Sequence, residues 1–188
     1  MLLLRIVLGV AGFQMMFLFV GVASASLAVA APPVIATEFP TRILASQNAM
    51  RAHAGVPPLI WDNALATGAA AWAQHMAQTG AFEHSSRRSR RGIGENMWSG
   101  SHAYYSPEAM AGLWNAEARN FVPGVFPNVS RTGNWFDVSH YTQVIWPTTT
   151  RVGCALASNG RSDYVVCRFS PAGNVDGKSV GYRIIPKR

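Results

Sequence analysis

The sequence predicts an α+β domain, with helices early in the chain and antiparallel strands late. Helical patterns fall before residue 121, and strand-like runs follow at residues 141–146, 152–158 and 163–170. This order lacks the strict alternation of strand and helix that builds a doubly wound parallel sheet. The turn-like sequence NGRS, residues 159–162, separates the last two runs and indicates a hairpin, so the pairing is expected to be antiparallel.

The amino terminus has the pattern of a secretory signal peptide. Arg5 precedes an apolar block, residues 6–20, and two A-x-A tripeptides follow within residues 23–30. We expect residues 1–30 to be the signal peptide, 31–38 a linker and 39–188 the folded domain. The alternative is a retained membrane anchor, because the apolar stretch approaches the ~20 residues that span a bilayer. The protein is therefore expected to be secreted or periplasmic, with membrane anchoring as the alternative.

Size and charge narrow the function classes. Removal of residues 1–30 leaves 158 of the 188 residues, enough for one domain with a sizeable core. The formal charge of +7 falls to +6 when Arg5 is lost. A basic surface favours anionic partners such as cell-envelope polymers or lipid head groups. No nucleic-acid partner is expected, because the chain is exported and has no basic motif interleaved with aromatic residues.

Three helices are expected, each bounded by residues that start or stop helices. Apolar residues recur in them at helical spacing, and serine, asparagine or aspartate stands where a cap is needed. The helices run from Pro40 to Ala54, from Asp62 or Asn63 to Gly80, and from Ser106 onward with Pro107 in the first turn. The segments between and after them, residues 81–105 and 121–136, are rich in glycine and polar residues and are expected to be ordered loops, the first with a brief helical turn.

The two cysteines fit opposite each other in the predicted hairpin. With Gly160-Arg161 as the loop, Cys154 faces Cys167 on a non-hydrogen-bonded pair, where Cα atoms approach to ~4.5 Å and a disulfide can form. An Asn159-Gly160 loop would shift the register by two residues and separate the sulfurs. Two cysteines in an exported chain are expected to form a disulfide, so the first register is favoured. The cross-link contributes about 3 kcal/mol to stability.

Two residues are chemically out of place in their predicted elements. Glu117 lies on the apolar stripe of the third helix, where a carboxylate is costly unless it is paired. His140 begins the run HYTQVIW, residues 140–146, which alternates and contains β-branched residues and is therefore expected to be a strand. A helix edge and a core histidine are the ordinary explanations. No local metal motif such as HExxH or CxxC occurs, so any site must be assembled by the fold.

These segments resemble the CAP superfamily, which includes the plant group-one pathogenesis-related proteins, the insect venom antigen 5 allergens and the cysteine-rich secretory proteins. The resemblance covers nearly all of the chain after the leader. It is carried by the motifs WA at 72–73, FEHS at 82–85, GEN at 94–96, WNAE at 114–117, HYTQVIW at 140–146, VGCA at 152–155 and VCRFSPAGN at 166–174.

The resemblance implies an α-β-α sandwich with a central antiparallel sheet beside an open groove. It also implies that two histidines and two glutamates converge in that groove, namely His84, Glu95, Glu117 and His140. The chain departs from the family in two places. The first helix has QNAMR, residues 47–51, where the family often has HNxxR, and only the hairpin disulfide is matched, which leaves residues 121–136 without a cross-link.

Several functions are compatible with this tetrad. His84 and His140 suit a divalent cation, Zn²⁺ above all, with Glu95 and Glu117 lining the site. If the site keeps open positions, Glu95 or Glu117 becomes a candidate general base of a metal-dependent hydrolase or peptidase. The alternatives are a module that binds a sterol, another lipid or an envelope component, and a secreted scaffold.

Two neighbouring features are open to more than one interpretation. The cluster RRSRR, residues 87–91, is either a solvated loop or a steering surface for anionic ligands. A nucleophilic Ser85 with His84 as its base is disfavoured, because adjacent residues seldom aim at each other and no orienting acid is evident.

Overall fold

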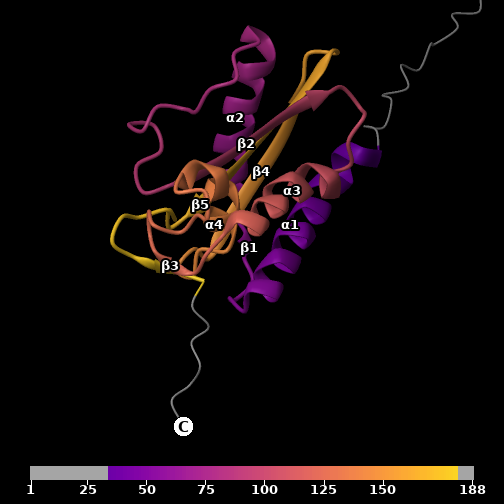
Figure 1. Ribbon diagram of the computed structural model, residues 1–188. Coiled ribbons are helices and arrows are strands. Elements are labelled where there is room, and N and C mark those ends of the chain that lie inside the picture. The colour runs from indigo at the N-terminus through magenta and orange to yellow at the C-terminus, as the bar shows by residue number, and fades with distance from the viewer. Residues whose placement is uncertain (1–33, 182–188) are drawn as a thin grey trace, which may run out of the picture. The chain divides into compact units, whose positions relative to one another are not determined.

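A four-stranded sheet forms the centre of the computed structural model, which describes residues 34–181 (Figure 1). The strand order is β1-β4-β5-β2. Strands β4 (Arg151–Ser158) and β5 (Ser162–Ser170) make the predicted hairpin, β2 (Gly94–Ser101) pairs antiparallel with β5, and the short β1 (Ile60–Trp61) runs parallel to β4. A second sheet joins β3 (Gly124–Val125) to β6 (Ser179–Val180). The predicted α+β class is confirmed.

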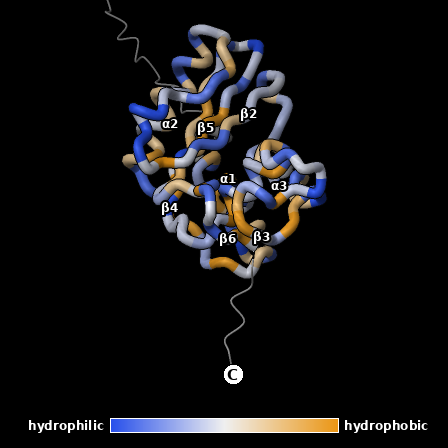
Figure 2. The backbone as a smooth tube through the Cα atoms, turned by 60° about the vertical axis from the view of Figure 1, so that its left-hand side comes forward, coloured by the Kyte–Doolittle hydropathy of each residue, from blue (hydrophilic) through white to orange (hydrophobic). Residues whose placement is uncertain are grey.

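Helices cover both faces of the central sheet, as the alternation of side chains along β5 shows. Tyr164 and Val166 pack against α2 (Asn63–Thr79). Val165 and Cys167 point the other way, toward α1 (Val34–Ala54) and α3 (Pro107–Ala116). Figure 2 shows hydrophobic residues along β5, between these layers. This is the sandwich that the family resemblance implied.

The second and third helices begin and end where their caps predict. Asp62 accepts hydrogen bonds from the first backbone N–H groups of α2, and Gly80 ends that helix with a φ of 73°. Ser106 accepts a hydrogen bond from Ala109 N at the start of α3. The first helix differs from expectation: α1 begins at Val34, so much of the predicted linker 31–38 is helical and Pro40 lies inside the helix. The predicted leader, residues 1–30, lies outside the described residues.

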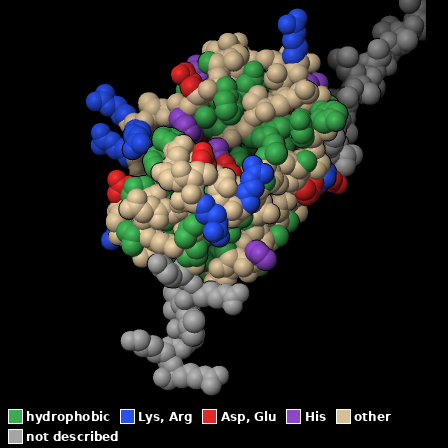
Figure 3. Space-filling model, viewed as in Figure 1, with side chains coloured by type: hydrophobic (Ala, Val, Ile, Leu, Met, Phe, Trp, Pro, Cys, Tyr) green, Lys and Arg blue, Asp and Glu red, His purple; other side chains and the backbone are tan. Residues whose placement is uncertain are grey.

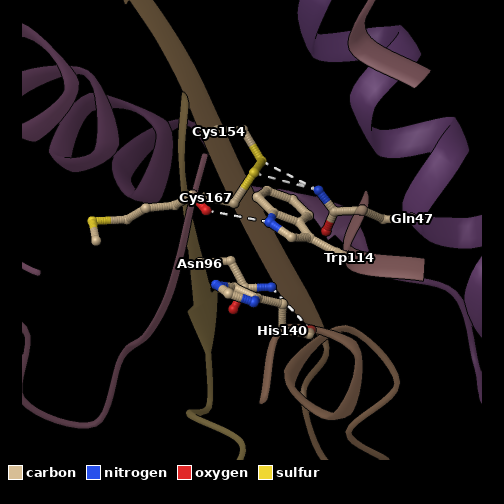
Figure 4. The surroundings of a disulfide bond; sticks show 7 residues. Gln47, Asn96, Trp114, His140, Cys154 and Cys167 are labelled. Atoms are coloured by element: carbon tan, nitrogen blue, oxygen red, sulfur yellow. Dashed lines mark hydrogen bonds between the residues drawn. A yellow bond between two sulfur atoms is a disulfide. The ribbon is translucent and has the colours of Figure 1, made fainter. Parts of the chain in front are cut away.

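The hairpin has the register that the cysteines require. Cys154 faces Cys167 with Cα atoms 4.0 Å apart, the two sulfurs are bonded, and Gly160 has the positive φ of 82° expected at its loop position. Gln47, which stands where the family often has histidine, donates from Nε2 toward both sulfurs at 3.4 Å (Figure 4). The first helix is thereby tied to the disulfide.

Two secondary-structure predictions were wrong because tertiary contacts override local preference. Residues 94–101 were expected to be loop, but they form β2, whose Gly- and Ser-rich sequence is held by eight register positions along β5. Residues 141–146 were expected to be a strand, but α4 (Ser139–Val144) is helical, followed by a turn. The β-branched residues there favour a strand only locally. The segment 121–136 is mostly irregular, as predicted, apart from β3 and the start of η2 (Trp135–Val138).

The end of α4 is fixed by a buried arginine. Arg51 is fully buried, and its guanidinium donates to the carbonyl oxygens of Pro57, Val144, Trp146 and Thr149 at 2.6–2.9 Å. Burial lowers the pKa of Arg51 to about 10, so the group stays charged at neutral pH. The Val144 carbonyl is one that a helix end leaves without an internal partner. Arg51 therefore binds α1 to the end of α4.

Within residues 34–181, none of the helices combines the length and the apolar character needed to span a bilayer.

Replacement of Arg51 by methionine is expected to destabilise the fold by about 3 kcal/mol or more, because buried carbonyl groups lose their donor. Urea unfolding of the variant measures the change. Arg42, which is partly exposed and pairs with Glu108 at 2.7 Å, provides the control. Arg42→Met should cost less than about 1 kcal/mol, and equal losses for the two variants would contradict the role given to Arg51.

Candidate functional site

A groove of about 710 Å³ opens beside the start of β2 and the start of α4. Its lining includes three of the four residues expected to form a site, His84, Glu95 and His140. The fourth, Glu117, lies behind His140 and touches it. Figure 3 shows histidine side chains in the hollow on this face of the molecule, with basic side chains gathered at its left margin. The structure thus brings the four predicted residues together as two histidine–glutamate pairs.

The first pair holds α4 in place. Glu117 begins η1 (Glu117–Asn120) after the end of α3, and its Oε1 lies 2.6 Å from His140 Nδ1. Its other oxygen accepts from the backbone N–H groups of His140 and Tyr141 at 2.9 and 3.1 Å. These are unpaired donors of the first turn of α4, which has no cap from its own segment. One carboxylate therefore starts the helix and orients the ring.

The second pair contains the more deeply buried carboxylate. The side chain of Glu95 is fully buried, and its Oε1 lies 2.9 Å from His84 Nδ1. Ser85 donates to the same carboxylate from its backbone N–H at 3.0 Å and from its hydroxyl at 2.6 Å. Burial raises the pKa of Glu95, but the hydrogen bonds from His84 and Ser85 and the charge of Arg90 outweigh it and lower the pKa below its ordinary value. Glu95 is therefore an ionised anchor for His84.

Both pairs set the same tautomer of the histidine ring. A carboxylate only accepts hydrogen bonds, so Nδ1 of each imidazole carries the proton. In the neutral ring Nε2 then keeps its lone pair. The side chains of His84 and His140 are 50% and 33% exposed, so both rings remain accessible from the groove that they line. The site thus presents two oriented nitrogen donors.

The carboxylates themselves are poorly placed for proton transfer. Every oxygen of Glu95 and Glu117 accepts a hydrogen bond from Ser85, from a histidine ring or from the α4 backbone. Among residues 34–181, moreover, no three His, Cys, Asp or Glu side chains converge as a metal cage. The geometry favours both glutamates as positioning groups for the histidines.

Ser85 is not placed to act as a nucleophile. It is only 3% exposed, and its hydroxyl donates to Glu95 rather than to His84. The adjacent histidine therefore pairs with the Glu95 carboxylate instead of activating the serine.

Sequence reasoning missed several residues that hold the site from behind. Asn96 donates from Nδ2 to the carbonyl of His140 at 3.0 Å, and the Trp114 ring is nearly parallel to the imidazole, with centroids 6.2 Å apart (Figure 4). Gln143 lines the groove and accepts from Gly173 N at 2.9 Å. All three belong to the motifs GEN, WNAE and HYTQVIW. Their position in those motifs was a signal, but their partners could not be known without the fold.

Acid should expose the contribution of Glu95 to stability. Its pKa is lower in the folded protein than in the unfolded chain, so the stability it contributes is present above about pH 4.3 and is lost as the pH falls through the folded pKa. Glu95→Gln should therefore be less stable than the wild type at pH 7, and the difference should narrow on acidification. Urea unfolding at a series of pH values measures both. Glu83→Gln, a change at an exposed acid in the segment before β2, serves as the control, and a gap that widens toward low pH would refute the assignment.

Comparisons with known proteins agree with the fold and the motifs. The model of the cysteine-rich secretory protein family (CAP) matches residues 44–169. Pathogenesis-related protein PR-1 of Medicago truncatula is 30% identical over 88% of this chain and 92% of its own length, and pathogenesis-related protein 1B of Nicotiana tabacum is 36% identical over 72% and 77%. Secreted protein RBT4 of Candida albicans is 33% identical over 75% of this chain but only 37% of its own length.

Solved structures share the same architecture. The crystal structure of NaASP2 with Zn²⁺ covers 79% of this chain and 87% of its own, with a TM-score of 0.62 at 23% identity. Schistosoma mansoni venom allergen-like protein 4 covers 75% and 96%, with a TM-score of 0.58 at 19% identity. At these identities the structures support the fold alone. Together with the family model and the plant relatives, they establish that the chain belongs to the CAP family of cysteine-rich secretory proteins.

Proposed function

We propose that the protein is an exported CAP-domain protein whose groove binds a divalent cation, zinc above all, through His84 and His140. The observation that carries the proposal is the pairing of both Nδ1 atoms with carboxylates at 2.9 and 2.6 Å, the first carboxylate fully buried and the second partly buried. Metal-binding histidines usually donate their second ring nitrogen to a carboxylate, which fixes the tautomer and makes the ligating nitrogen more basic. Two histidines that are accessible from one groove, each with Nδ1 bonded to a carboxylate, fit that pattern.

The donor set also indicates what kind of site this is. A structural zinc site is closed by four protein ligands, whereas two imidazoles leave positions for water or for a bound ligand. Affinity should accordingly be weaker than that of a closed site, and it should fall with decreasing pH because protons compete for Nε2. A bound zinc ion would supply Lewis acidity to a ligand in the groove. Hydrolysis would need a free general base, and Glu95 and Glu117 are both already engaged, so binding is favoured over catalysis.

One observation on a protein of the same fold is compatible with the proposal. One of the solved structures of this fold was determined with Zn²⁺.

The fold itself holds the two histidine rings in position. Each ring bonds to a carboxylate that also accepts from backbone N–H groups, of α4 in one pair and of the segment before β2 in the other. The rings are therefore ordered before any ion binds. Preorganisation of this kind reduces the entropy that binding would otherwise cost.

Zinc titration by calorimetry tests the metal site. We expect one binding event in the purified wild-type protein and its loss in the double variant His84→Ala/His140→Ala. His102 provides a matched control, because it is 48% exposed and its Nδ1 pairs with the buried Asp163 at 2.7 Å, but it does not line the groove. His102→Ala should leave binding unchanged. Binding that survives in the double variant, or is lost in the His102 variant, would refute the site.

Export of the protein is inferred from the leader pattern and from relatives such as the secreted RBT4 protein. Amino-terminal sequencing of protein from the periplasm or culture medium should find a chain that begins at Ala31. An intact Met1 in membrane-bound material would favour the anchor instead.

A further inference from the structure

Arginine side chains line one part of the groove. The cluster RRSRR contributes Arg87, Arg90 and Arg91 to the lining. Arg90 is committed to the fold, since it donates to the Ser85 carbonyl at 3.1 Å and lies 3.6 Å from Glu95. Arg87 and Arg91 are exposed and make no hydrogen bond or ion pair with another residue of the described range 34–181. Two guanidinium groups beside the cavity are thus available to a ligand.

The lining of the groove carries more positive than negative charge, with three arginines and two acids. Its acidic lining residues are Glu83 and Glu95, and Glu95 is buried and fully hydrogen-bonded. Positive charge held along a cleft concentrates the field there and attracts anions. Guanidinium groups recognise carboxylates with two parallel hydrogen bonds, which gives geometric selectivity as well as affinity. The groove is therefore suited to a ligand that carries carboxylates.

A fixed aromatic surface belongs to the same groove. Phe136 is 63% exposed and stacks on Trp135, with ring centroids 3.9 Å apart and an angle of 24° between the planes. Trp135 in turn packs edge-on against the buried Phe126, with centroids 5.2 Å apart. The Phe136 ring is held in place from one side and open to solvent on the other. Such a surface offers stacking area at little cost in conformational entropy.

A mixed lining beside two exposed arginines favours a sugar over a lipid. The lining is mixed, since Asn96, Gln143, Asn174 and the glycines Gly94 and Gly173 share it with apolar residues such as Phe82, Ile93 and Met97. A sterol or an acyl chain binds best where apolar side chains enclose most of its surface. A pyranose ring instead combines an apolar C–H face, which stacks on an aromatic ring, with hydroxyl groups that need polar partners. We infer that the groove binds an acidic saccharide, with Arg87 and Arg91 on its carboxylates and Phe136 against a sugar ring.

This inference rests on the proposed function, because the metal and the saccharide are both placed in the same groove. The saccharide, however, contacts side chains of the protein and not the metal. The probe is a tetrasaccharide of galacturonate, compared with the matched neutral galactose tetrasaccharide. Calorimetry on the wild-type protein should detect the acidic probe and show much weaker binding of the neutral one, and added salt should weaken the difference. Trp135 fluorescence should change on binding, because its neighbour Phe136 becomes covered.

Matched variants separate specific contacts from overall charge. Arg87→Gln/Arg91→Gln should weaken uronate binding by roughly tenfold or more, since charge-assisted hydrogen bonds are lost. Arg88→Gln/Arg161→Gln removes the same charge from exposed positions outside the groove and should have little effect. Phe136→Ala should also weaken binding, whereas Tyr104→Ala, a change at a 77% exposed ring elsewhere, should not.

Two outcomes would overturn the inference. The first is an equal loss of uronate binding in the two double-arginine variants. The second is that anionic phospholipid vesicles bind through Arg87 and Arg91, while the tetrasaccharide does not bind. Zinc titration of the Arg87→Gln/Arg91→Gln variant keeps the two proposals apart. This variant should retain its zinc affinity. A wild-type protein that binds uronate but not zinc would refute the metal site alone, and one that binds zinc but not uronate would refute saccharide binding alone.

Discussion

The groove depends on two carboxylates that each bind backbone or serine donors and a histidine ring at the same time. Glu117 accepts from two N–H groups of α4 and from His140, and Glu95 accepts twice from Ser85 and once from His84. A buried carboxylate must be compensated, and here the compensation is also what positions the imidazoles. The hydrogen bonds that offset the cost of burying the carboxylates are therefore the same ones that orient the histidine rings.

The short helix α4 is the element most dependent on distant partners. Glu117 satisfies donors at its first turn, and Arg51 of α1 satisfies the carbonyl of Val144 at its last residue. A helix of six residues is marginal by itself, because nucleation is costly and few internal hydrogen bonds form. Charged groups from two other helical segments thus hold both ends. The position of His140 is a property of the whole domain rather than of its own segment.

The motif in the first helix extends this support to the sheet. In QNAMR, Gln47 contacts the disulfide sulfurs, Asn48 exchanges two hydrogen bonds with the backbone of Leu59, and Arg51 reaches α4. The groove can therefore remain open while the structure around it stays fixed. An open groove with prepared nitrogen donors, free guanidinium groups and a stacked aromatic surface is suited to holding polar, anionic ligands rather than enclosing an apolar one.

The sequence by itself determined the elements whose information is local. Caps at Asp62 and Ser106 and the cysteine spacing of the hairpin predicted two helices and one register, and family motifs named the four site residues. Only the tertiary structure decided that residues 94–101 form a strand, that HYTQVIW begins as a helix, and which acid serves which histidine. The physical reason is the same in each case. Those outcomes depend on hydrogen-bond partners that are distant in the sequence or contributed by the fold, and such partners outweigh the local preference of a β-branched or glycine-rich segment.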